Sequence, residues 1–129
     1  MSIRLRRAYE APGAEDGYRV LVDRVWPRGR TRDELHLDAW ERDLGPSDEL
    51  RHWFGHDPAR WDGFQERYRA ELAAPDQASR LDALAERARD ATVTLIYGAR
   101  DEEHNQARVL AAELDRRLAG PPSTTASDG

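Results

Sequence analysis

Arginines cluster in one short segment of the sequence, where they can bind an anion. Four of the chain's 20 arginines fall within residues 24–32, in a chain of 129 residues. A guanidinium is a planar fork of donors that suits phosphate or carboxylate groups. Arg24 and Arg28 are candidate ligand contacts, and Trp26 offers a face for stacking. We expect Arg28 to be the main contact, because it lies between a proline and a glycine in a rigid loop. The alternative is that these arginines only tie a sheet to its helices.

A second candidate site follows the apolar run at residues 92–97. A strand that turns through glycine into a helix N-terminus favours anions, and Arg100 would assist. Three consecutive acids at 101–103 oppose this, because they would satisfy the helix dipole and repel an anion. His104 and Asn105 are expected in the first helical turn. His104 can act as a general acid or base, or simply pair with a nearby acid.

The four histidines also raise the question of a metal site. His52 and His56 are four residues apart, a spacing that can bring two ligands together on one helix face. Gly55 is expected to end the helix between them, so we predict no metal site. His56 lies in a loop and is a candidate ligand contact; the alternative is that it bonds a backbone carbonyl among core aromatic side chains.

Composition excludes several classes of chemistry. The chain has no cysteine and no lysine, which removes thiolate nucleophiles, Cys-ligated zinc and Schiff-base chemistry. Its net charge of -5 argues against general binding to nucleic acid, although residues 1–32 hold eight arginines against four acids. No segment resembles a signal peptide or a membrane span, so we expect a cytoplasmic protein with no membrane contact. No cofactor is predicted, and the oligomeric state is left open.

The elements that must position these residues are typical of an α/β domain. Strands are expected at residues 2–9, 18–26 and 92–97, with helices between the second and third. This order favours a small single-domain sheet with at least partly parallel strands, flanked by helices, over residues 1–118. Residues 119–129 have the composition of a disordered tail. In such folds ligands bind beyond the carboxyl ends of the strands, where both candidate sites fall.

Capping signals mark the expected helices. Thr31 and Glu34 fit a capping box, and Ser47 is the next plausible N-cap. Asp57 precedes a proline, which also signals a helix start. Asp101 is expected to be the N-cap of the last helix. Pro75 is expected to end the helix that begins after Asp57. One helix should bury an apolar stripe in the core, namely Trp61, Phe64, Tyr68 and Leu72.

Three segments together resemble the YeaO-like branch of a bacterial family, domain-of-unknown-function family 488. They are residues 18–29 (YRVLVDRVWPRG), 50–72 (LRHWFGHDPARWDGFQERYRAEL) and 94–110 (TLIYGARDEEHNQARVL). The resemblance spans roughly residues 1–118. It implies a small cytoplasmic α/β protein and does not imply an activity.

A wider branch of this family carries a cysteine in the second strand-end loop and then a Cys-His-Arg triplet. In this chain Tyr97 takes the place of the first cysteine, and Asn105 begins the segment that replaces the triplet. A thiol-based reaction therefore does not carry over. Asp23, Arg28, Asp101 and His104 have counterparts in that branch, and this implies one pocket where the two strand ends meet.

Three functions follow as hypotheses. The first is a pocket that binds a small anionic molecule, a nucleotide or phosphate ester, held by Arg24, Arg28 and Arg100, with Trp26 or Tyr97 stacking on a base. The second is an adaptor or regulatory module whose basic first quarter docks a protein or nucleic acid. The third is a thiol-independent hydrolase or transferase in which Asp23 and His104 move the proton.

Overall fold

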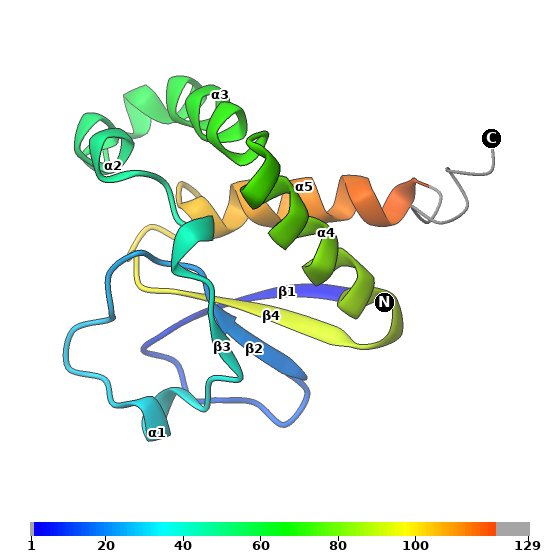
Figure 1. Cartoon of the computed structure of the whole chain (residues 1–129). Helices are drawn as coiled ribbons and strands as arrows, with labels where there is room; N and C mark the ends of the chain where they lie inside the picture. The colour runs from blue at the N-terminus through cyan, green and yellow to red at the C-terminus, as the bar shows by residue number, and fades with distance from the viewer. Residues whose placement is uncertain (1, 121–129) are drawn as a thin grey trace.

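The computed structural model describes residues 2–120, and its central feature is a four-stranded parallel sheet (Figure 1). The strands are β1 (Ser2–Arg7), β2 (Tyr18–Leu21), β3 (Ala39–Trp40) and β4 (Thr92–Tyr97), in the order β1-β4-β2-β3. β4 pairs with both β1 and β2, and all the pairings are parallel. The predicted α/β fold is confirmed, and the two strands that lead to the candidate sites are neighbours.

Helices supply the other layers. They are α1 (Arg32–Leu35), α2 (Asp48–Phe54), α3 (Trp61–Leu72), α4 (Pro75–Asp90) and α5 (Gln106–Ala119), with short 3-10 helices η1 (Arg42–Leu44) and η2 (Pro58–Arg60). Figure 1 shows α2 to α5 together on one side of the sheet and α1 on the other. The sheet is therefore covered unequally, by four helices on one face and by a short helix with its loops on the other.

Side-chain alternation along the strands builds two hydrophobic clusters. The larger lies between the sheet and α2 to α5 and includes Val20 and Leu95. Three residues of the predicted stripe, Phe64, Tyr68 and Leu72, are buried in it, and Trp61 packs against it half-buried. The smaller cluster, on the opposite face, comprises Ala8, Leu21, Leu35 and Ile96, with Trp26, Leu37 and Trp40 packed against it.

Most of the expected capping residues take their predicted roles. The Thr31 side chain accepts from the Glu34 N–H, and the Glu34 side chain accepts from the Thr31 N–H, which completes a capping box. Ser47 caps α2, which ends at Gly55 in a left-handed conformation. Asp57 accepts from the Ala59 N–H and begins the short 3-10 helix before α3.

Two predicted element boundaries are wrong. The strand expected at 18–26 ends at Leu21, because its partner β4 ends at Tyr97 and the last backbone bond between them joins the Val22 N–H to the Ile96 carbonyl at 3.1 Å. Pro75 begins α4 rather than ending α3, since a proline lacks the N–H that the first helical turn does not use.

The predicted start of the last helix is also wrong. Asp101 was expected to cap it, but Asn105 does so, accepting from the Arg108 N–H at 3.1 Å. Asp101 instead accepts from the N–H groups of Glu103 and His104 in a separate turn. Because aspartate forms this local turn as readily as a helix cap, the sequence pattern did not separate the two. His104 therefore precedes the helix, and Asn105 is its N-cap.

The ends of the chain were also the subject of predictions. Of the predicted tail, 119–129, only the first two residues are described, and Ala119 ends α5. Residues 121–129 lie outside the described part. Among residues 2–120, no helix has the length and apolar character needed to span a membrane.

The buried hydroxyl of Tyr68 generates a stability prediction. It donates to the Leu44 carbonyl, and Tyr68 is fully buried. Tyr68→Phe should lower the free energy of unfolding by about 1–3 kcal/mol, because that carbonyl loses its donor away from water. Denaturant unfolding measures the loss. Tyr18→Phe is the control, since that hydroxyl makes no hydrogen bond within residues 2–120; equal losses in both variants would contradict the prediction.

Candidate functional site

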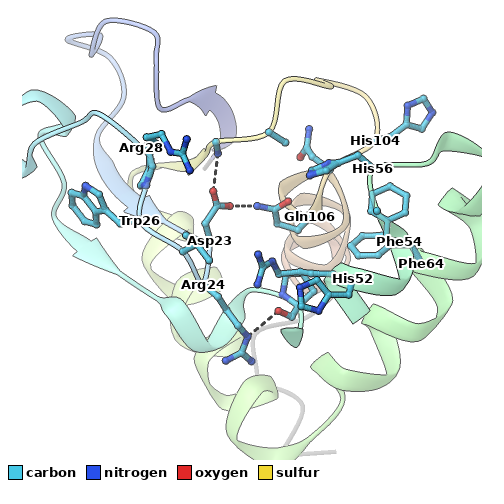
Figure 2. Close-up of a pocket in the computed structure, with 18 of the residues that line it drawn as sticks. Asp23, Arg24, Trp26, Arg28, His52, Phe54, His56, Phe64, His104 and Gln106 are labelled. Carbon is cyan, nitrogen blue, oxygen red and sulfur yellow. Dashed lines mark hydrogen bonds between the residues drawn. The ribbon is translucent and has the colours of Figure 1, made fainter. Parts of the chain in front are cut away.

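A cleft of about 480 Å³ opens where the carboxyl ends of β2 and β4 meet α2 and the start of α5. Residues 23–28, which follow β2, form one wall, and α2 with the loop after it forms another. Residues 98–99 and 104–106, after β4, complete it. Figure 2 shows Asp23 at the centre, with Phe54 and Phe64 to one side. The cleft lies at the edge of the sheet where parallel α/β folds bind ligands.

Asp23 connects three of these segments through hydrogen bonds. Its Oδ2 accepts from the Gly98 N–H at 2.8 Å, and its Oδ1 accepts from Nε2 of Gln106 (Figure 2). Its backbone carbonyl accepts from the Trp40 indole at 2.6 Å. The carboxylate thus joins the chain after β2 to the end of β4 and to the first residue of α5.

Gly98 lies close to the carboxylate that it bonds. A Cβ added there would lie 3.1 Å from Oδ2 of Asp23, a tight contact that the carboxylate would have to relax. Glycine avoids this crowding while its N–H donates to the same oxygen. The glycine after β4, which the sequence suggested as an anion-binding turn, therefore serves the protein's own carboxylate.

Burial raises the pKa of Asp23 from 3.8 to about 6, although the Gly98 N–H and the nearby Arg51 favour the charged form. The hydrogen-bond donors therefore do not fully offset the loss of water around the carboxylate. A partly buried aspartate with a raised pKa in a cleft is typical of a functional site.

The charge of the cleft is opposite to that of the chain. The sequence has 25 acids against 20 arginines, yet Asp23 is the only acid that lines the cleft within the described part of the chain. The lining also contains three arginines and three of the four histidines, namely Arg24, Arg28, Arg51, His52, His56 and His104. This local excess of basic groups favours an anion.

Arg28 has the most available of these guanidinium groups. Its side chain is exposed and makes no hydrogen bond or ion pair with any residue in the range 2–120, and Figure 2 shows it on the same side of the cleft as Asp23. Its backbone carbonyl is held by the Tyr9 hydroxyl at 3.0 Å. A fixed backbone with an uncommitted guanidinium is a suitable anion contact.

Arg24 and Trp26 line the cleft but have structural partners. Nε of Arg24 donates to the carbonyls of Gly45 and Pro46, at 3.1 and 2.9 Å. The Trp26 ring points away from Asp23 in Figure 2, and its centroid lies 5.2 Å from that of Trp40 in an edge-on arrangement. Because the ring already packs against Trp40, it does not present a free face toward Asp23, where the sequence analysis expected it to stack on a base.

His104 pairs with Asp101 and not with Asp23. Its Nδ1 lies 2.9 Å from Oδ2 of Asp101, and its ring packs edge-on against Trp61 at 5.3 Å. The Glu103 N–H and the His104 ring hold the pKa of Asp101 below its usual range. Figure 2 shows Asp23 and His104 well apart, and no hydrogen bond joins them among the described residues. They do not form a proton-transfer pair in this structure.

His52 and His56 contribute to the wall formed by α2 and its loop. Both are exposed, and His56 has a left-handed backbone, with φ of 57°, directly after Gly55. That conformation is uncommon for a residue with a side chain and is enriched at functional sites. Among residues 2–120, no group of three or more histidine or acidic side chains could hold a metal ion.

Three residues predicted to contact a ligand lie outside the cleft lining. Tyr97 is buried in the larger hydrophobic cluster, and this burial raises the pKa of its hydroxyl. Arg100 is exposed, and Asp101 is occupied by the turn before α5. Asn105 lines the cleft, but its amide caps α5 and donates to the Asp101 carbonyl at 2.8 Å.

Sequence reasoning missed several lining residues. Gln106 is the first residue of the helix that follows the loop after β4, so the rule that strand ends converge could have identified it. Arg51 and His52 lie on α2, far from either strand end in sequence, and only tertiary packing brings them to the cleft. Phe54 and Phe64 belong to the hydrophobic core and also line the apolar side of the cleft.

Together these features define a small α/β protein with a ligand-sized cleft at the carboxyl ends of its parallel strands. Residues 2–128 match a family model described as the inactive DUF488-N3 subclade. The chain therefore belongs to the DUF488 family, and the resemblance noted in the sequence is confirmed.

Two curated relatives illustrate the family. The chain is 41% identical over 111 residues to the uncharacterized protein YeaO of Escherichia coli K12, covering 86% of this chain and 95% of that protein. It is 39% identical over 115 residues to the uncharacterized protein Rv3073c of Mycobacterium tuberculosis H37Rv, covering 89% and 95%. No solved structure matches this one significantly.

The raised pKa of Asp23 predicts how stability depends on pH. The folded state keeps its proton up to about pH 6, whereas the unfolded chain releases it near 3.8, so stability falls as the pH rises through this window. Asp23→Asn removes this loss and should be more stable than the wild type by about 1–2 kcal/mol at pH 8. This free-energy difference is smaller than the full pKa shift of Asp23 would give, because water reaches part of the carboxyl group.

Denaturant unfolding from pH 4.5 to 8 measures this difference. The advantage of the Asn variant should shrink toward pH 4.5, where the wild-type carboxyl group is protonated in the folded state. Asp62→Asn, on the exposed side of α3, is the matched control and should show no such trend. An Asn variant that is less stable by the same amount at every pH would contradict the assignment.

Proposed function

We propose that this protein binds a small anionic molecule, a nucleotide or phosphate ester, in the cleft at the carboxyl ends of β2 and β4. The observation that carries the proposal is the charge inversion: one acid against three arginines lines the cleft, in a chain whose net charge is -5 with histidine counted as neutral. Arg28 is the main anion contact, because its guanidinium has no partner within residues 2–120. The cleft volume suits a ligand of this size.

Arg51 is the second contact in this proposal. It lies on α2, on the wall opposite residues 23–28, and its ion pair with Asp48 at 2.6 Å is partly exposed. Exposed ion pairs contribute little to stability, so an anion can compete for this guanidinium at low cost. Phe54 and Phe64 also line the cleft but are buried, so they offer the ligand little exposed apolar surface.

Binding without catalysis is the form of the proposal that has most support. The matching family model is described as inactive, and the cleft has no thiol because the chain has no cysteine. Asp23 and His104, the candidates for acid–base chemistry, are bonded to separate partners. The hydrolase or transferase hypothesis therefore has less support than the binding hypothesis.

The adaptor hypothesis also has less support. Most arginines of the basic first quarter form ion pairs within the protein, namely Arg4 with Glu15, Arg6 with Glu10 and Asp16, Arg19 with Asp16, Arg24 with Asp43, and Arg30 with Glu34. The ion pair of Arg19 with Asp16 is fully buried. Charges neutralised in this way attract a polyanion weakly, so the segment offers less of a docking surface than its composition indicates.

Thermal-shift screening against inorganic phosphate, nucleotides and phosphorylated sugars tests the proposal. A bound compound should raise the melting temperature of the wild type, and Arg28→Ala should weaken its affinity by roughly tenfold or more, since a charge-assisted hydrogen bond contributes about 1.5–3 kcal/mol. Arg100→Ala is the matched control, because Arg100 is exposed outside the cleft and should leave the affinity unchanged.

Two outcomes would reject the proposal. One is that no anionic compound stabilises the wild type at millimolar concentration. The other is that Arg28→Ala retains the wild-type affinity. Equal losses in Arg28→Ala and Arg100→Ala would indicate a general charge effect and count against a site in this cleft.

A further inference from the structure

The carboxylate of Asp23 accepts hydrogen bonds only from neutral groups within residues 2–120. No arginine forms an ion pair with it, although three line the same cleft. Each carboxylate oxygen accepts one hydrogen bond, from Gly98 or from Gln106, and each has a second lone pair available. The carboxylate can therefore accept further hydrogen bonds from a ligand in the cleft.

Gln106 adds a second acceptor beside it. Its Nε2 is directed at Asp23, so the Oε1 of the same amide remains to accept a hydrogen bond. The neighbouring polar groups are already used: the Asn105 amide caps α5, and Nδ1 of His104 bonds Asp101. This part of the cleft thus offers acceptors, whereas Arg28 offers donors.

We infer that the ligand carries an ammonium or amino group close to its anionic group, with Asp23 and Gln106 accepting from the former and Arg28 donating to the latter. This inference rests on the proposed function and narrows its ligand class to zwitterionic or amino-substituted anions. A ligand with only an anionic group could bind Arg28, but the Asp23 carboxylate in the same cleft would repel it. A donor group placed against Asp23 converts that repulsion into a charge-assisted hydrogen bond.

A purely structural role explains Asp23 less well. An asparagine would accept from the Gly98 N–H through its oxygen, and its amide nitrogen would donate to Gln106 Oε1 once the Gln106 amide turned over. Both structural links can therefore be made without a negative charge. Burial raises the pKa of Asp23 to about 6, which means that the folded protein bears a cost for keeping it. Costs of this kind are typical of groups retained to bind a ligand.

A matched pair of probes tests the inference, namely 2-aminoethyl phosphate and ethyl phosphate at pH 7.5. They share the phosphate group and differ in the ammonium. Titration followed by ¹H–¹⁵N NMR measures both affinities, with the Gly98 amide and the Gln106 side-chain amide as reporters, because both bond Asp23. We expect the wild type to bind 2-aminoethyl phosphate about tenfold more tightly than ethyl phosphate, as one charge-assisted hydrogen bond would give.

Two variants assign the preference to residues. In Asp23→Asn the tenfold preference should vanish, and ethyl phosphate should bind at least as tightly as to the wild type, because the repelling charge is gone. In Arg28→Ala both probes should weaken while their ratio stays near tenfold. Asp62→Asn is the charge-matched control outside the cleft and should behave as the wild type. The wild-type comparison decides the inference even if a variant folds poorly.

The outcomes separate this inference from the proposed function. Equal affinity for the two probes, or tighter binding of ethyl phosphate, overturns the inference and leaves the anion site standing, provided that Arg28→Ala weakens both. A preference that survives in Asp23→Asn also overturns it. Binding of neither probe overturns the inference and the proposed function together.

Discussion

The carboxylate of Asp23 is the interaction on which the geometry of the cleft depends. β2 ends two residues before it, β4 ends one residue before Gly98, and α5 begins at Gln106, so its two hydrogen bonds join three segments that would otherwise diverge. Parallel strands carry their chain ends to the same edge, but their loops are free to leave in any direction. One acceptor shared by a backbone N–H and a side-chain amide fixes those directions and so defines the cleft.

Sequence reasoning was most accurate where a local rule is strict. The caps at Thr31, Ser47 and Asp57 were correct, because the residue that bonds the first turn lies within three positions of its partner. The parallel pairing of β2 with β4 agrees with the predicted sheet of at least partly parallel strands, since helices between the strands favour parallel pairing. The cap at Asp101 was not correct, because an aspartate-bonded turn has the same local signature as a helix start.

Prediction of the site had a different limit. The segment at residues 23–28 was identified from arginine clustering, which is visible along the chain. Arg28 makes no side-chain bond within residues 2–120, and its role as the main ligand contact stays a prediction. Arg51 reaches the cleft only because α2 packs across the sheet edge, and no spacing rule encodes that placement. Trp26 shows the converse, because its type suggested a ligand platform while its ring packs against Trp40 on the opposite face. Residue type indicates what a side chain can do, and packing decides what it faces.

The arginines of the basic first quarter of the chain differ in whether they have partners within the protein. Arg4, Arg6 and Arg19 pair with acids of the loop between β1 and β2, so their charges organise the sheet face away from α2 to α5. Arg28 lies in the same quarter and has no such partner within residues 2–120. Arg7 and Arg32 also lack an acid partner there, so the feature that distinguishes Arg28 is its place in the lining of the cleft. The cleft thus holds an unpaired guanidinium and a carboxylate with no ion-pair partner within residues 2–120, and a ligand carrying both charges would pair with both groups.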